Sequence, residues 1–180
     1  MLMSILYPGR MATPTVVVAI QRLAKRITKW CRECDRRLIR LYEYAYGAQD
    51  YLLEGSLSTE DRDVVELHVY ADGDLNGNIW DTKSTAGLWI ELSGLSNRTW
   101  PVYWASRAEP ATASTTQESE MVALSMAVRN EACPLQLLLS TLLGRPVVCK
   151  VFEDNAATIA AAEKGYSRPC AISRGIYAAR

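Results

Sequence analysis

Three acidic residues stand where the chain is expected to pass from one regular element to the next. Asp72 ends a run of alternating apolar residues, Glu120 lies near the start of a helical pattern, and Asp154 follows a second apolar run. Carboxylates that converge from separate elements can hold two hard cations roughly 3.5–4 Å apart during phosphodiester hydrolysis. The order strand-end Asp, helix Glu, strand-end Asp therefore predicts a two-cation hydrolytic site, and oxygen ligands favour Mg²⁺ or Mn²⁺.

Two glutamates of one predicted helix compete for the second position in this site. Residues two apart on a helix point about 200° away from each other, so only one of Glu118 and Glu120 faces the sheet. Thr115 followed by Glu118 forms a capping-box pattern, which gives Glu118 a structural role at the helix start. Glu120 shares a face with Leu124 and Ala127, so we predict that Glu120 points inward.

The third position has two candidates and a structural alternative. Asp154 precedes a short Ala-rich helix and is a suitable N-cap, although Asn155 could fill that role instead. The alternation of strand 147–152 places Asp154 and Glu153 on opposite faces of the sheet. Alternation alone does not say which face meets Asp72, so the residues leave this choice open. Asp72 has an alternative of its own, as an ordinary turn residue.

The elements that must position these acids follow from hydrophobic periodicity. Alternating apolar residues predict strands at 65–71, 86–92, 100–105 and 147–152. Helical patterns cover 116–131, closed near Pro134, then 135–143 and 155–163. Short connections make the first three strands an antiparallel meander, and the helical crossover predicts that the fourth runs parallel to the first. The order βββαβα is that of a mixed α/β sheet, with the first strand between the second and the fourth.

A helical flank precedes this domain. Apolar residues recur at helical spacing from 14 to about 46 and predict two amphipathic helices. A connector rich in Gly, Ser, Asp and Glu follows, so we divide the chain into a flank at 1–63 and a main domain at 64–167. The tail, 168–180, lacks helical recurrence and is expected to be irregular.

Composition limits the partners and the setting of the protein. At 180 residues with 20 basic and 20 acidic side chains, the net charge is zero, so nucleic acid would have to be held by local patches. Five irregularly spaced cysteines without a secretory leader predict an intracellular setting, cytoplasmic or nuclear. The apolar run 16–20 is shorter than the ~20 residues of a membrane span, so no membrane partner is predicted.

Two further features have ordinary interpretations. Cys31-x-x-Cys34 is typical of zinc and redox sites, but no second cysteine pair and no nearby histidine accompanies it, so we predict no metal there. The first forty residues are basic. A solvated helix face is the ordinary reason for such charges, and contact with phosphates is the alternative.

Five sequence words occur in the order found in a known family: Tyr70-Ala71-Asp72-Gly73-Asp74, Asp81-Thr82-Lys83-Ser84-Thr85-Ala86-Gly87, Trp104-Ala105-Ser106-Arg107, Glu118-Ser119-Glu120 and Asp154-Asn155. Over about nine tenths of its length the chain resembles the ribonuclease H region, with the preceding reverse-transcriptase connection, of copia-type retrotransposon polyproteins. The resemblance implies a ribonuclease H-like fold and two Mg²⁺ or Mn²⁺ ions. It also implies hydrolysis of the RNA strand of an RNA–DNA hybrid, with catalytic and metal-binding roles for Asp72, Glu120 and Asp154. It thereby selects Asp154 over Glu153.

The implied partners are an RNA–DNA hybrid and the remainder of the retroelement polyprotein. After Gly165-Tyr166-Ser167 the family continues with a further polar metal-site residue and a final helix, but this chain has no Asp or Glu beyond Glu163. The departure predicts that the C-terminal helix is missing, as in a truncated or decaying copy altered by a frameshift or by splicing. Two alternatives stay open, a catalytically inactive remnant and a nucleic-acid-binding module that does not cleave.

Overall fold

A computed structural model of the chain describes residues 1–76, 83–110, 113–164 and the backbone of 176–178. It divides into two compact units, Met1–Glu54 and Gly55–Arg180. The words at Asp81-Thr82 and Gly165-Tyr166-Ser167, and most of the tail, lie outside the described residues. In the described part of the chain, no helix has the length and apolar character needed to cross a membrane.

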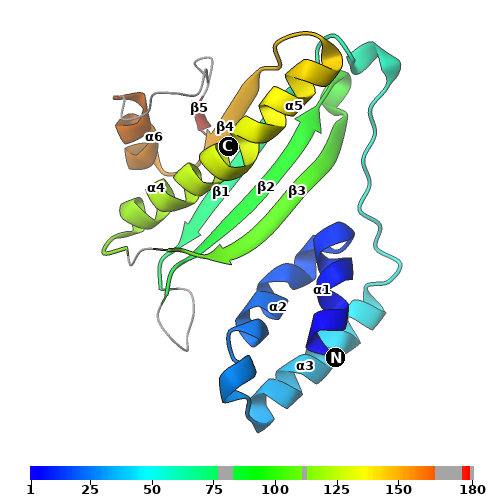
Figure 1. Cartoon of the computed structure of the whole chain (residues 1–180), viewed down its shortest axis with the longest axis vertical. Coiled ribbons are helices and arrows are strands. Elements are labelled where there is room, and N and C mark those ends of the chain that lie inside the picture. The colour runs from blue at the N-terminus through cyan, green and yellow to red at the C-terminus, as the bar shows by residue number, and fades with distance from the viewer. Residues whose placement is uncertain (77–82, 111–112, 165–175, 179–180) are drawn as a thin grey trace. The chain divides into compact units, whose positions relative to one another are not determined.

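The second unit is built on a mixed sheet with the strand order β3-β2-β1-β4-β5 (Figure 1). The strands are β1 (Glu66–Asp74), β2 (Thr85–Ser93), β3 (Thr99–Ala108), β4 (Cys149–Glu153) and β5 (Ile176–Ala178). β1 pairs with β2 and β2 with β3 antiparallel, whereas β1 and β4 run parallel. The predicted meander and the central place of the first strand are confirmed, and the fold is ribonuclease H-like, of the mixed α/β class.

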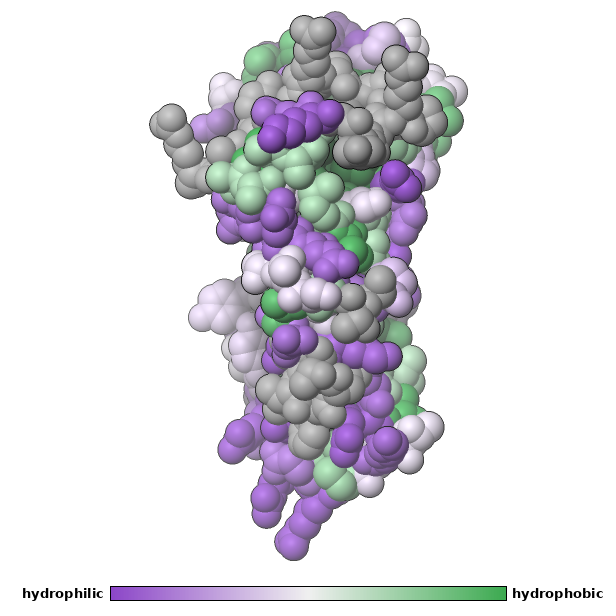
Figure 2. Space-filling model, turned by 90° about the vertical axis from the view of Figure 1, so that its left-hand side faces the viewer, coloured by the Kyte–Doolittle hydropathy of each residue, from purple (hydrophilic) through white to green (hydrophobic). Residues whose placement is uncertain are grey.

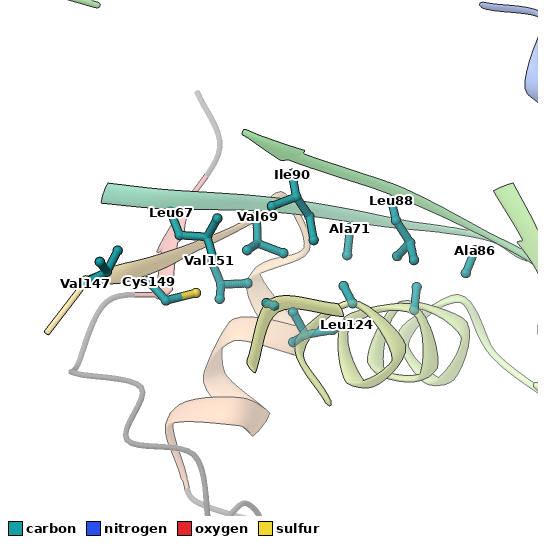
Figure 3. Packing of buried hydrophobic residues seen from close by; sticks show 13 residues of the cluster. Leu67, Val69, Ala71, Ala86, Leu88, Ile90, Leu124, Val147, Cys149 and Val151 are labelled. Atoms are coloured by element: carbon teal, nitrogen blue, oxygen red, sulfur yellow. The ribbon is translucent and has the colours of Figure 1, made fainter. Parts of the chain in front are cut away.

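One face of this sheet packs against a long helical segment. Alternate residues of β1, β2 and β4 point toward α4 (Thr116–Met126), as Figure 3 shows. Their side chains and those of the helix form a buried apolar core: Leu67, Val69, Ala71, Ala86, Leu88, Ile90, Ala123, Leu124, Ala127, Cys149 and Val151. The period-2 pattern of the strands thus fixes which residues meet the helix.

The prediction that the helix closes near Pro134 is wrong, because the helical segment continues past this residue. α4 continues through a π-helical stretch, η5 (Ala127–Ala132), into α5 (Cys133–Leu143). A wide π turn before a proline accommodates the missing N–H and the bulk of the ring, so the helix passes this point without ending. It ends at Gly144, whose φ of 67° is left-handed, as expected for a glycine after the last turn.

Two shorter elements, α6 and β5, follow β4 in the chain. α6 (Ala156–Glu163) follows β4, as the Ala-rich pattern predicts. The irregular conformation expected for 168–180 is wrong for Ile176–Ala178, which pair with β4 as a parallel strand. Without this pairing, β4 would have unpaired backbone N–H and C=O groups along its outer edge. Ile176–Ala178, which contains a β-branched and an aromatic residue, is suited to pair with them.

The first unit is a helical cluster with a core of its own. It contains α1 (Leu2–Met11), η1 (Pro14–Val16), α2 (Val17–Ala24), η2 (Ile27–Lys29) and α3 (Arg32–Gly47). Their shared core is formed by Leu2, Ile5, Val16, Ile20, Leu23, Cys34, Leu38 and Leu41. Two amphipathic helices were predicted here, and α1, which carries Pro8 inside it, was missed. Figure 2 shows that hydrophilic residues cover much of the face that it draws, with smaller hydrophobic patches between them.

An ion-paired turn links the start of the second unit to its sheet. Asp61, in the short helix η3 (Thr59–Asp61), is buried and accepts hydrogen bonds from the N–H groups of Ser58 and Leu95. The Arg98 guanidinium, next to η4 (Leu95–Asn97), donates to both Asp61 oxygens at 3.0 Å. These bonds hold the pKa of Asp61 below its usual range, first through Arg98 and then through Ser58.

Candidate metal centre

The ends of β1 and β4 bring the predicted acids to one edge of the sheet. In the parallel register, Tyr70 of β1 lies beside Phe152 of β4, and their rings stack with centroids 4.7 Å apart. Asp72 and Asp154 each follow two residues later. Because parallel strands end at the same edge, the sheet brings both carboxylates to the edge beyond the carboxyl ends of β1 and β4.

Asp72 and its neighbour Gly73 lie on opposite faces of the sheet. Asp72 is exposed, on the face of β1 that also carries Tyr70, whereas Gly73 is buried beneath α4. A Cβ on Gly73 would come within 2.6–2.7 Å of the backbone of Ser119 and Glu120. Only glycine allows the helix to approach this closely, so Gly73 determines the position of α4 above the site.

The start of α4 places Glu120 beneath the helix, as predicted. Thr115 is the N-cap and accepts from the Glu118 N–H at 3.1 Å, while Glu118 accepts from the Ser114 N–H at 2.7 Å and stays exposed. Glu120 is 5% exposed, and its Oε2 accepts from the Gly73 N–H at 2.7 Å. The predicted geometry is confirmed, with Glu118 at the exposed helix start and Glu120 facing inward.

Asp154 is not needed as the helix cap that the sequence allowed. The Asn155 side chain accepts from the N–H groups of Ala157 and Thr158 and caps α6. The residue before Asp154, which the resemblance left out of the site, is buried. Glu153 is 1% exposed, one of its oxygens accepts from the Asn155 N–H at 3.1 Å, and Oε2 is buried without a hydrogen-bond partner among the described residues.

Three carboxylates meet at this point. One ligand oxygen each from Glu120, Glu153 and Asp154 lies within 4.8 Å of the other two, an arrangement that could hold a metal ion. With Asp154 selected for the third position, we expected Glu153 to point away from the site. That expectation is wrong, because the strand parity of Glu153 directs it under α4 with Val151. Asp72 is not a member of this group of three and lies beside it, near enough for its charge to act on Glu120 and Glu153.

Burial and mutual repulsion raise the pKa values of three carboxyl groups in and beside this site. Burial, and after it the charges of Glu153, Asp72 and Asp154, raise the pKa of Glu120 to about 7, against the lowering effect of the Gly73 N–H. Burial first and the Asp154 charge second raise the pKa of Asp72. Burial likewise raises the pKa of Glu153. Buried carboxylates that repel one another favour either a bound proton or a bound cation.

The donor set fits a hard divalent cation. Mg²⁺ binds oxygen at about 2.1 Å, so ligands on opposite sides of one ion are roughly 4.2 Å apart, and Ca²⁺ accepts slightly larger separations. The spacing of the three oxygens is thus close to that of a single coordination shell. The unpartnered Oε2 of Glu153 supplies an independent reason, because a buried carboxylate oxygen normally finds a donor or a cation.

A sequence signal for Glu153 was present at Lys150. A lysine in the middle of an apolar strand favours the less covered face, and Lys150 there forms an ion pair with Glu66 at 2.5 Å. Residues of opposite parity, including Val151 and Glu153, must then face the helix. Position 153 was therefore predictable as buried, although its membership of the carboxylate group was not.

The comparisons with known proteins add little to this geometry. No family model matches the chain. A solved structure with some similarity is the protease–reverse transcriptase of prototype foamy virus, at 17% identity and a TM-score of 0.35. The match covers 62% of this chain and spans 14% of the length of that protein. At this TM-score the likeness decides nothing, so the ribonuclease H-like assignment depends on the strand order and the crossover.

Proposed function

We propose that the second unit is a divalent-metal nuclease domain that hydrolyses the RNA strand of an RNA–DNA hybrid. The observation that carries this proposal is the convergence of Glu120, Glu153 and Asp154, with Asp72 beside them, at the shared edge of two parallel strands. The sequence words around Asp72, Glu120 and Asp154 supply the substrate class, through their resemblance to copia-type retroelements.

The positions of Asp72, Asp154 and Glu120 suit two different tasks. Asp72 and Asp154 are exposed, so they are the acids that an approaching nucleic acid would meet together with the cations. Glu120 lies beneath them and is held by the Gly73 N–H, which orients one oxygen and leaves the other for coordination. When bound, two Mg²⁺ or Mn²⁺ ions would supply an activated water and stabilise the leaving oxygen.

Glu153 extends the acid set beyond the three that the resemblance implies. One Glu153 oxygen lies within 4.8 Å of oxygens of Glu120 and Asp154, and its Oε2 has no hydrogen-bond partner among the described residues, so we assign Glu153 to the same cation. The full set of four acids carries more negative charge than one cation neutralises, which is consistent with two ions in the complete site. The remaining partners in this proposal are the hybrid itself and the rest of a retroelement polyprotein.

Cleavage of a labelled hybrid tests the proposal directly. The full chain is incubated with a hybrid that carries the label on its RNA strand, in Mn²⁺, in Mg²⁺ or in EDTA. RNA–RNA and DNA–DNA duplexes serve as substrate controls. Asp154→Asn should abolish cleavage, and Glu163→Gln, the same type of change at an exposed position on α6, should leave it unchanged.

The two alternative functions give different results in this assay. A nucleic-acid-binding module would shift the hybrid in a gel without cutting it, with or without metal. An inactive remnant would neither cut nor bind. Either pattern, obtained with folded protein at high enzyme concentration in both metals, would refute the nuclease proposal.

A further inference from the structure

A cysteine pair lies at the beginning of the longest helix of the first unit. Cys31 is the N-cap of α3 and is exposed, whereas Cys34, one turn later, is 1% exposed within the helical core. Their sulfur atoms are 3.7 Å apart, and both are free thiols. A disulfide bond of about 2.05 Å therefore needs a change of about 1.7 Å in sulfur position, which side-chain rotation supplies.

The surroundings of Cys31 stabilise its thiolate. The Cys34 N–H, then the Cys34 thiol and the Glu33 N–H, lower the pKa of Cys31 below its ordinary value of 9.0, and the Arg26 side chain adds to this effect. Glu33 and Cys34 lie in the first turn of a 16-residue helix, where the helix dipole also favours negative charge. A thiolate that is exposed and stabilised in this way is the nucleophilic form of cysteine.

The local charge favours an anionic reaction partner. Arg26, Lys29 and Arg32 surround the position of Cys31 in the sequence. Two acids also lie in the first turn, and only one of them forms an ion pair. Glu33 pairs with Arg37 at 3.0 Å. Asp35 accepts a hydrogen bond from the Trp30 indole N–H at 2.7 Å. The indole is neutral, so Asp35 keeps its charge, but residues 26–37 hold five basic and two acidic side chains and therefore carry a net charge of +3.

We propose that Cys31 and Cys34 are a thiol–disulfide exchange site for an anionic low-molecular-weight disulfide of the glutathione type. The Cys31 thiolate attacks one sulfur of the disulfide, whose S–S bond breaks, and the first thiol leaves after taking up a proton. Cys34 then loses its proton to solvent and attacks the Cys31 sulfur. The bond between Cys31 and the small molecule's sulfur breaks, and the second thiolate leaves and takes up a proton from solvent. The protein loses two electrons, the small disulfide gains them, and an intramolecular disulfide remains. This site is independent of the nuclease proposal.

Differential alkylation of the full chain tests the site. The reduced protein is equilibrated with mixtures of reduced and oxidised glutathione, quenched in acid, blocked with N-ethylmaleimide and digested with trypsin. Cleavage after Lys29, Arg32 and Arg36 makes the product recognisable, because a disulfide joins peptide 30–32 to peptide 33–36. Cys149 is an internal control in the same sample, since burial raises the pKa of its thiol to about 11 and leaves it unreactive.

Two variants separate the roles of the cysteines. Cys34→Ala keeps a small apolar group in the core and should accumulate the mixed disulfide on Cys31, whereas Cys31→Ser should leave Cys34 unmodified. In the wild type we expect Cys31 to react at least roughly tenfold faster than Cys149. Failure of folded wild-type protein to yield the linked peptide in excess oxidised glutathione, or absence of a mixed disulfide in folded Cys34→Ala, would overturn the proposal.

Discussion

Replacing Glu120 by glutamine removes a buried charge and keeps its hydrogen bond. The glutamine carbonyl can accept from the Gly73 N–H, which donates to Glu120 at 2.7 Å in the wild type. The pKa of Glu120 rises from 4.5 to about 7 through burial and the neighbouring carboxylates. At pH 8 the folded chain therefore carries a charge that costs about 3 kcal/mol relative to the unfolded chain.

The free energy of unfolding should fall as the pH rises, because the pKa of Glu120 is higher in the folded chain than in the unfolded chain. A carboxyl whose pKa is higher in the folded state contributes its full stabilisation below pH 4.5, and this contribution is lost as the pH rises to about 7. The free energy of unfolding in metal-free buffer should therefore fall between pH 5 and pH 8. Glu120→Gln should lack most of this fall and be more stable than the wild type at pH 8, by at most about 3 kcal/mol. Glu153 and Asp72 readjust their protonation when the neighbouring charge disappears, which reduces the gain.

Urea unfolding followed by far-ultraviolet circular dichroism measures this effect. The buffers contain EDTA and stay above pH 5, because the lowered pKa of Asp61 makes its own contribution disappear only in stronger acid. Glu163→Gln is the matched control and should follow the wild-type profile. If Glu120→Gln is less stable than the wild type at pH 8, or shows the same pH dependence, the buried-charge explanation is wrong.

Three other substitutions give separate checks. Glu153→Gln should weaken Mn²⁺ binding roughly tenfold, or about 1.4 kcal/mol, in a titration followed by electron paramagnetic resonance; Glu118→Gln, at the exposed helix start, should leave the affinity unchanged. Gly73→Ala should lower the free energy of unfolding in urea by about 1–3 kcal/mol, because the added carbon meets the α4 backbone at 2.6 Å. Asp61→Asn should lower the midpoint of thermal unfolding, because it leaves Arg98 without its buried anion; an unchanged midpoint would show that the ion pair is dispensable.

Strands β1 to β4 were predictable because each of them carries a run of apolar residues with the spacing of a strand. Apolar residues alternate along β1, and the short connections to β2 and β3 allow only an antiparallel meander. The long helical crossover before β4 then requires a parallel neighbour for β1. Glu120 was assigned correctly for the same kind of local reason, since the capping pattern at Thr115 already occupied Glu118.

The features that were missed depend on contacts between distant segments. α1 forms around Pro8 because Leu2 and Ile5 are covered by α2 and α3, which no local pattern reveals. β5 forms because the edge of β4 is available, although the tail itself shows no strand periodicity. The depth of Glu153 depends on which face of β4 the crossover helix covers, and Lys150 was the one local indication of it.

The placement of Glu153 bears on whether this site still works as a metal centre. A buried carboxylate without a partner destabilises a fold unless it is protonated or coordinated. A domain selected only for folding would gain by replacing Glu153 with an apolar residue of similar size, like the Val151 and Cys149 that share its face. A cation reverses this balance, because it binds the folded carboxylate set and stabilises the native state in proportion to its occupancy. Stabilisation of the wild type by millimolar Mg²⁺ or Mn²⁺ at pH 8, and its loss in Glu153→Gln, would therefore indicate a functional centre. A wild type indifferent to both metals would favour the inactive remnant.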